Sequence, residues 1–217
     1  MDYAAARQHM IDCQIRTSKV TDQSVIEALA AVPREAFVAE AQKKLAYIDR
    51  PVAIGAGRRM TEPMVLARLL QVAHLRPTET VLIVGAGTGY SASVVSRLVK
   101  KVVALESVPE LAARAKGILG QLSITNVTVV TGDLAAGQPA DGPYDFILVD
   151  GAAEVVPEAL TAQLADRGRL AVVVKDHGVV GRGTIFVKAD GVVSQRAIFD
   201  ADAEVLPGFT RPQRFVF

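Results

Sequence analysis

Residues 81–90 read VLIVGAGTGY, four strand-forming residues followed by a turn with three glycines and closed by a tyrosine. Glycines placed directly after a strand allow a tight turn and remove Cβ atoms that would keep a ligand away. Gly85 and Gly87 suit that purpose, and Gly89 lets the following helix begin close to the strand. The stretch therefore predicts a nucleotide-cradling turn between a strand and a helix, although the glycines alone would also fit a plain tight turn.

The spacing of the glycines separates the classes of cofactor. Nicotinamide-binding turns read G-x-G-x-x-G, whereas this chain has G-x-G-x-G, and it contains no G-x-x-x-x-G-K-[ST] that would indicate a P-loop. Glu106 ends the next predicted strand, VVALE (102–106), where a carboxylate can accept hydrogen bonds from both hydroxyls of a ribose. Because G-x-G-x-G followed by such a carboxylate is typical of S-adenosylmethionine-dependent methyltransferases, we expect S-adenosylmethionine as the cofactor.

Further cofactor contacts are expected at the ends of neighbouring strands, where ligands bind in open α/β sheets. Asp133 follows the third strand in TGD (131–133) and could bond an adenine amine, or could instead cap a turn. Tyr90 could pack at the mouth of the site or in the core. The predicted cofactor-binding residues are Gly85, Ala86, Gly87, Gly89, Tyr90, Glu106, Ser107, Asp133 and Leu134.

Strands and helices alternate from about residue 80, which favours a parallel sheet with right-handed crossovers and helices on both faces. GTIFVK (183–188) and VVSQRAIF (192–199) flank Asp190-Gly191 and read as an antiparallel hairpin. The expected strands are 81–84, 102–106, 127–130, 144–150, 169–174, 183–188 and 192–199, and the expected helices of this part are 90–100, 108–121 and 156–165. The fold class is α/β, with a Rossmann-like sheet and a C-terminal antiparallel hairpin.

The first 75 residues have a different character and predict a helical appendage before an α/β unit at 76–217. Thr21 or Asp22 is expected to cap one helix. DRPVAIGAGRRM (49–60) reads as a loop because of its proline and glycines. Thr61 is a candidate N-cap of the next helix, whose first turn holds Pro63.

Composition narrows the partners. With 24 basic and 23 acidic residues among 217, the net charge of +1 gives no reason to expect nucleic acid or an anionic membrane. No apolar run approaches the roughly 18 residues of a membrane span. The single cysteine, Cys13, excludes an internal disulfide and a cysteine metal cluster and favours the cytoplasm. The histidines His9, His74 and His177 are scattered, so no metal is expected, and the sequence carries no signal for an oligomeric state.

Several longer stretches, in their order, resemble the protein-L-isoaspartate O-methyltransferase family. The resemblance covers most of the chain and rests on VPREAFV (32–38), AYIDRPVAIGAG (46–57), TEP (61–63), VLIVGAGTGYSASVVSRL (81–98) and GPYDFILVDGAAEVVPEALTAQLADRGRLAVVV (142–174). It implies a class I methyltransferase fold and methyl transfer from S-adenosylmethionine to the carboxyl of isoaspartyl residues in damaged proteins or peptides.

The resemblance also implies a substrate side to the site. The hydroxyl of the family's Ser/Thr-x-P motif corresponds to Thr61, which becomes the candidate catalytic residue that orients the substrate carboxylate. Arg59, Met60 and Asp150 join Thr61 as candidate substrate-binding residues. Asp150 stands where the family commonly has a small or neutral residue, and it could act as a base or as a substrate anchor. Because a carboxylate oxygen is already a competent nucleophile, catalysis would come from holding it in line with the methyl group while water is excluded.

The chain departs from the family pattern at positions that keep alternatives open. Ile83 stands where the family has an acidic residue, Arg58 and Arg59 replace a neutral substrate loop, and Leu134 replaces a glycine. The two arginines could bind a substrate carboxylate or phosphate, or could lie in an exposed loop. The alternatives are a methyltransferase of the same fold with another substrate, and a non-catalytic member of the family that acts as a binding or scaffold protein.

Overall fold

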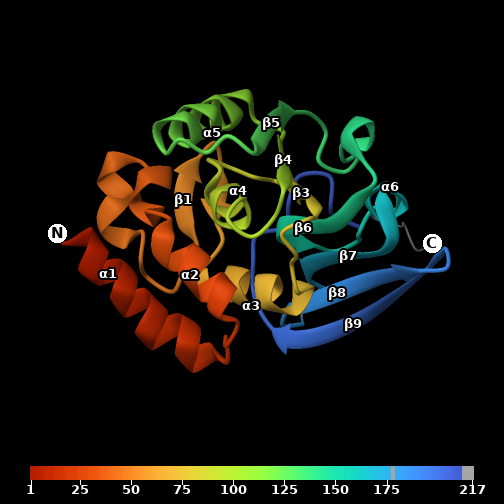
Figure 1. Ribbon diagram of the computed structural model, residues 1–217, viewed down its shortest axis with the longest axis horizontal. Helices are drawn as coiled ribbons and strands as arrows, with labels where there is room; N and C mark the ends of the chain where they lie inside the picture. Colours follow the sequence, from red (N-terminus) through yellow and green to blue (C-terminus); the bar gives the residue numbers. More distant parts are fainter. Residues whose placement is uncertain (177–178, 212–217) are drawn as a thin grey trace, which may run out of the picture.

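The computed structural model describes residues 1–176 and 179–211 (Figure 1). Its helices are α1 (Tyr3–Met10), α2 (Gln23–Ala31), α3 (Pro63–Ala73), α4 (Tyr90–Val95), α5 (Pro109–Gln121) and α6 (Glu158–Ala162). Its strands are β1 (Val52–Gly55), β2 (Arg58–Met60), β3 (Thr80–Val84), β4 (Lys101–Glu106), β5 (Val127–Thr131), β6 (Tyr144–Ala153), β7 (Leu164–Val174), β8 (Arg182–Ala189) and β9 (Val192–Asp200).

The main sheet confirms the predicted fold class. Its strand order is β5-β4-β3-β6-β7-β8-β9. Neighbouring strands from β5 through β4, β3 and β6 to β7 are parallel, and β8 and β9 add the antiparallel hairpin. The chain runs outward from β3 to β4 and β5 on one side and continues with β6 on the other. A crevice at the carboxyl ends of β3 and its neighbours is where such sheets bind ligands, and the glycine turn lies there.

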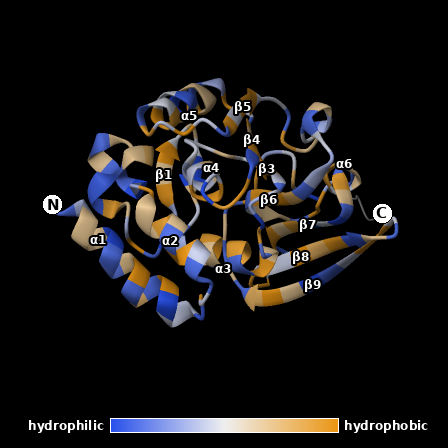
Figure 2. Cartoon of the chain, viewed as in Figure 1, coloured by the Kyte–Doolittle hydropathy of each residue, from blue (hydrophilic) through white to orange (hydrophobic). Residues whose placement is uncertain are grey.

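Two apolar clusters cover the two faces of the sheet. Successive strand residues point to opposite faces, so Ile83 belongs to the larger cluster with α2, α3 and α5, whereas Leu82 and Val84 belong to the smaller one with α6 and Phe209. In Figure 1 the N-terminal elements α1, α2 and β1 lie at one end of the molecule, away from the β8–β9 hairpin. Figure 2 shows hydrophobic residues along β7 and β8, while α1 alternates between hydrophobic and hydrophilic residues.

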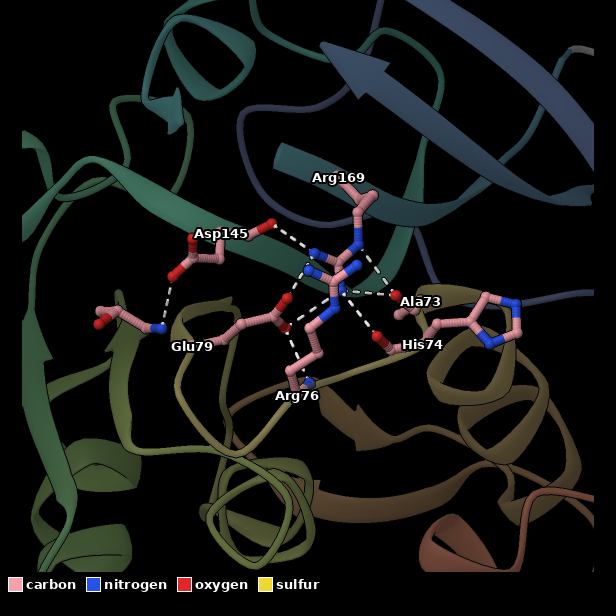
Figure 3. A network of polar contacts seen from close by, with 7 residues as sticks. Ala73, His74, Arg76, Glu79, Asp145 and Arg169 are labelled. Atoms are coloured by element: carbon pink, nitrogen blue, oxygen red, sulfur yellow. Dashed lines mark hydrogen bonds and ion pairs between the residues drawn. The ribbon is translucent and has the colours of Figure 1, made fainter. Parts of the chain in front are cut away.

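A polar network ties α3 to the amino ends of β3, β6 and β7, at the edge of the sheet opposite the glycine turn (Figure 3). The guanidinium of Arg169 donates to both carboxylate oxygens of Glu79, at 2.8 and 3.1 Å, and to the carbonyls of Ala73, His74 and Asp145. Glu79 also accepts from the backbone N–H of Arg76. The network satisfies the last carbonyls of α3, which a helix leaves without intrahelical partners.

Several local predictions were wrong at the level of detail. The segment 49–60, expected as a loop, contains the β1–β2 hairpin, whose strands pair antiparallel around Gly55–Gly57. Thr61 does not cap α3: the N-cap is Glu62, which makes no side-chain cap bond, and the Thr61 hydroxyl bonds elsewhere. Helices α4 and α6 are shorter than expected, and β7 begins at Leu164, five residues early. Of the two predicted caps of α2, Thr21 and Asp22, the structure has Asp22, whose carboxylate accepts hydrogen bonds from the N–H groups of Ser24 and Val25.

Within residues 1–176 and 179–211, no helix has the length and apolar character that would let it cross a membrane. The same residues contain no group of three or more His, Cys, Asp or Glu side chains able to hold a metal ion. His177 lies outside the described residues. The division of the chain at residues 75 and 76 stays a prediction.

Candidate functional site

The glycine turn has the backbone geometry that its sequence requires. Gly85, Gly87 and Gly89 have φ values of +80°, +56° and +95°, a region that favours glycine. The N–H groups of Gly85 and Ala86 both donate to the carbonyl of Leu105, which ties the turn to the end of β4. A Cβ on Gly89 would lie 3.3 Å from the Cβ of Ala115, so this glycine allows close approach of α5.

Glu106 is the charged centre of the site. Its side chain is completely buried, and its Oε2 accepts a 2.7 Å hydrogen bond from the N–H of Gly87. Its Oε1 accepts from the N–H groups of Ser107 and Val108, at 2.9 and 3.1 Å, and from the Ser107 hydroxyl at 3.3 Å. The carboxylate therefore faces the glycine turn in a fixed orientation, and its expected contact with the hydroxyls of a ribose stays a prediction.

Arg58 is the unexpected member of the site. Its Nη1 lies 2.8 Å from Oε1 of Glu106, and its Nη2 donates to the carbonyl of Gly85 at 3.1 Å. The side chain of Arg58 is only 7% exposed, so the interpretation of this arginine as part of an exposed loop is wrong. Its neighbour Arg59 is exposed and makes only a long contact of 3.5 Å with the carbonyl of Pro51.

The space above the glycine turn is filled by side chains of this chain. A Cβ on Gly85 would lie 2.8 Å from Cδ1 of Leu206 and 2.9 Å from Nη2 of Arg58, and one on Gly87 would lie 2.6 Å from Cδ1 of Ile54. Two cavities lie beside them, each of about 10 Å³. A small-molecule site usually measures roughly 300–1,000 Å³, so these side chains do not leave room for a nucleoside cofactor.

Thr61 and Asp150 meet at the rim of the same region. The Thr61 hydroxyl donates to Oδ1 of Asp150 at 2.6 Å, which joins the start of α3 to β6. The completely buried Arg34 donates to the carbonyl of Thr61 at 2.6 Å and to that of Ala46 at 2.7 Å. Both small cavities have Asp150 in their lining, so Thr61 and Asp150 border the space beside the glycine turn.

The remaining predicted residues occupy different environments. Tyr90 and Met60 are buried, with the Tyr90 ring packed edge-on to Phe37 and beneath Arg34, and Leu134 is buried in the smaller apolar cluster. Asp133 is exposed, and its Oδ1 accepts from the N–H of Ala135, the geometry of the predicted turn cap. Ser107 contacts Glu106. Most of the predicted cofactor-binding residues therefore lie around the carboxyl ends of β3 and β4, and Asp133 lies farther out.

Burial is the largest cause of the pKa shifts near Thr61. It lowers the pKa of the Arg34 guanidinium and raises the pKa of the Tyr90 hydroxyl beneath it. Burial also raises the pKa of Glu62, with Asp49 and Asp202 adding repulsion between like charges. Arg34 is thus a buried cation in contact with the Thr61 carbonyl.

Arg34 and Leu206 belong to the site but were not among the predicted site residues. Arg34 lies in VPREAFV, a stretch that carries the family resemblance but does not set Arg34 apart from its charged neighbour Glu35. Leu206 comes from the segment after β9, which runs beside β6 through a bridge between Val205 and Ala152. No sequence pattern marks such a long-range return.

Comparison with known proteins gives a consistent result. The family model described as protein-L-isoaspartate(D-aspartate) O-methyltransferase matches residues 5–200. A protein-L-isoaspartate O-methyltransferase of Roseiflexus sp. (strain RS-1) is 42% identical over 172 residues, which are 79% of this chain and 78% of the relative. A protein of the same name from Methylorubrum extorquens (strain PA1) is 42% identical over 177 residues, which are 82% of this chain and 77% of the relative.

Solved structures agree with the fold. A protein-L-isoaspartate O-methyltransferase structure superposes with a TM-score of 0.82 at 26% identity, over 93% of this chain and 66% of the other. A Plasmodium falciparum structure, described as a putative protein-L-isoaspartate O-methyltransferase in complex with S-adenosyl-L-homocysteine, has a TM-score of 0.77 at 21% identity and covers 95% and 99%. With the family match extending over most of its length, this chain belongs to the protein-L-isoaspartate(D-aspartate) O-methyltransferase family.

Proposed function

We propose that this protein is an S-adenosylmethionine-dependent O-methyltransferase that methylates the carboxyl of isoaspartyl residues in damaged proteins and peptides. The family match and the names of the relatives support this activity. The observation in the structure that carries it is the contact of Thr61 with Asp150, because it brings the TEP segment to the edge of the sheet that bears the glycine turn.

The chemistry asks little of the protein beyond positioning. A carboxylate oxygen is a nucleophile without further activation, and S-adenosylmethionine supplies the methyl group when it is bound. We infer that Thr61 orients the substrate carboxylate through its hydroxyl, whose single proton turns from Asp150 to the substrate when the substrate binds. Arg34 holds Thr61 in place through its backbone carbonyl. The exposed guanidinium of Arg59 can attract a substrate carboxylate by charge.

The cofactor side of the site fits the cofactor only in part. The glycine turn and the oriented carboxylate of Glu106 suit a ribose. The side chains of Arg58, Leu206 and Ile54, however, fill the space that a nucleoside needs. Cofactor binding in this arrangement requires those side chains to move.

A paired methylation assay tests the activity. Two peptides that differ only in carrying isoaspartate or aspartate at one position are incubated with the protein and with S-adenosylmethionine labelled in its methyl group. We expect label in the isoaspartyl peptide and none in the aspartyl peptide. Equal labelling of both peptides, or of neither, would contradict the proposal.

A second candidate is a non-catalytic member of the family, and the filled space at Gly85 and Gly87 is the observation that favours it. Calorimetry with S-adenosylhomocysteine separates the two candidates. Measurable binding supports the enzyme, while no binding at millimolar ligand supports the non-catalytic protein.

We also propose the cytoplasm as the compartment and isoaspartyl-containing proteins as the partners. The single cysteine, Cys13, which is free and exposed, supports a reducing compartment. The net charge of +1 supports a protein substrate over nucleic acid. A fractionation experiment that finds the protein with a cytoplasmic marker enzyme would bear out the compartment.

A further inference from the structure

Arg58 uses the hydrogen-bonding groups that the glycine turn presents to a ligand. One terminal nitrogen of its guanidinium donates to Glu106 and the other to the carbonyl of Gly85. The ion pair is buried, with side chains 7% and 0% exposed. A buried pair of this kind is strongly held, because separating its partners leaves an uncompensated charge.

Glu106 does not need Arg58 to keep its orientation. The N–H groups of Gly87, Ser107 and Val108 hold its two oxygens. If the arginine side chain were withdrawn, the carboxylate would keep three backbone donors and would face the turn with free acceptor positions. Glu106 is thus able to exchange one partner for another without rearranging the strand that carries it.

The segment that carries Arg58 is short and joined to the rest of the molecule by few backbone bonds. Strands β1 and β2 pair with each other in a separate two-stranded sheet. The turn between them is exposed, with φ values of +109°, +51° and +71° at Gly55, Ala56 and Gly57. Arg114 donates to the carbonyl of Ile54, and Val52, Ile54 and Met60 are buried in the larger apolar cluster, so the hairpin stays anchored while the Arg58 side chain turns away.

We propose that Arg58 is an intramolecular competitor of the cofactor: it occupies the nucleoside site through Glu106 and Gly85 and must leave before S-adenosylmethionine binds. The inference rests on the proposed function, since it takes the glycine turn as the site of that cofactor. Leu206 reinforces the closed form, because it covers Gly85 beside the guanidinium. Binding affinity then reflects the fraction of molecules in which Arg58 has released Glu106.

Calorimetry with S-adenosylhomocysteine tests the competition on three proteins: the wild type, Arg58→Gln and Arg50→Gln. Arg58→Gln removes the charge that holds Glu106, and Arg50→Gln is the matched control, an exposed arginine eight positions earlier. We expect Arg58→Gln to lower the dissociation constant roughly tenfold or more, because the apparent constant varies inversely with the competent fraction. We expect Arg50→Gln to match the wild type.

Three outcomes overturn the proposal: an unchanged constant in Arg58→Gln, weaker binding in Arg58→Gln, or no detectable binding to any of the three proteins. Circular dichroism shows whether the Arg58→Gln variant is folded. If Arg58→Gln is unfolded, hydrogen exchange on the wild-type protein decides the question.

Hydrogen exchange reports the displacement without any substitution. A ligand usually slows exchange around its site, whereas release of Arg58 should speed exchange of the amides in residues 52–60 while exchange at 85–89 slows. Slower exchange in both segments on adding S-adenosylhomocysteine would overturn the proposal. A failure of the proposed function would look different: tighter binding by Arg58→Gln with no labelling of the isoaspartyl peptide leaves the competition intact and rejects only the substrate.

Discussion

The hydroxyl of Thr61 donates a 2.6 Å hydrogen bond to Oδ1 of Asp150, although 89 positions separate the two residues. The contact joins the segment that enters α3 to β6, next to the glycine turn. It places the Thr61 side chain beside the glycine turn and leaves the N-cap position of α3 to Glu62.

Removal of the Thr61 hydroxyl should slow methylation. We expect Thr61→Ala to lower kcat/KM for an isoaspartyl peptide by roughly 10- to 100-fold, because losing the group that orients a reactant costs about that much. Thr61→Ser keeps the hydroxyl and should retain most of the activity. The measurement is initial-rate methylation with labelled S-adenosylmethionine, and equal rates for Ala and wild type would show that Thr61 does not orient the substrate.

Breaking the Arg169–Glu79 pair should destabilise the fold. Arg169→Met leaves the carboxylate of Glu79, 5% exposed, without its cation. The expected loss is about 3–5 kcal/mol in the free energy of unfolding, the usual cost of removing one partner of a buried pair. Urea denaturation measures it.

The double variant Arg169→Met/Glu79→Leu is the control for that experiment. Because it removes both charges, we expect it to be more stable than Arg169→Met alone. If the loss of unfolding free energy in the double variant equals the sum of the losses in Arg169→Met and Glu79→Leu, the two side chains do not act as a unit.

Two serines of α4 should respond in opposite directions to alanine. Both are completely buried, but Ser93 Oγ donates to the carbonyl of Gly89 at 2.8 Å, while no described group lies in hydrogen-bonding geometry with Ser91 Oγ. Ser91→Ala should leave stability unchanged or raise it by up to about 1 kcal/mol, and Ser93→Ala should lower it by about 0.5–1.5 kcal/mol. Equal effects in urea denaturation would contradict the difference in bonding.

The Lys101–Asp141 pair should make stability depend on pH at the acidic end. Hydrogen bonds from Lys101 and then Gln138 hold the pKa of Asp141 below its ordinary value of 3.8. A carboxyl whose folded pKa is lowered stabilises the fold above its unfolded pKa, and that contribution disappears as the pH falls through the folded pKa.

Asp141→Asn should therefore be less stable than wild type at pH 7, by about 0–1 kcal/mol because the pair is partly exposed. The difference should shrink as the pH falls below 3.8 and vanish once the pH is below the lowered folded pKa, where the wild-type carboxyl is protonated as well. Thermal unfolding at a series of pH values measures both proteins. A difference that stays constant down to the lowest pH would assign the effect to packing.

The sequence predicted the sheet well because its information is local. Strand β3, the glycine turn and β4 read directly from VLIVGAGTGY and VVALE. The hairpin of β8 and β9 was equally readable from Asp190-Gly191, both of which have positive φ.

The sequence could not predict the partners that come from distant segments. Arg58 reaches Glu106 across 48 positions, and Leu206 returns to cover Gly85 from the end of the chain. Neither contact has a periodicity or spacing that a pattern could reveal. Of the two roles that the sequence left open for Thr61, the helix cap is wrong: its hydroxyl contacts Asp150, a partner that only the fold supplies.

The larger apolar cluster has a consequence for how the molecule loses its structure. It runs without interruption from Met10 and Leu29 in the N-terminal helices to Ile83 in the strand before the glycine turn. The hydroxyl of Thr88, inside that turn, also donates to the carbonyl of Phe37 at 2.6 Å. Opening of the N-terminal helices and disorder of the turn should therefore be one cooperative event, so a substitution as remote as Leu29→Ala would loosen the cofactor side of the molecule without touching it.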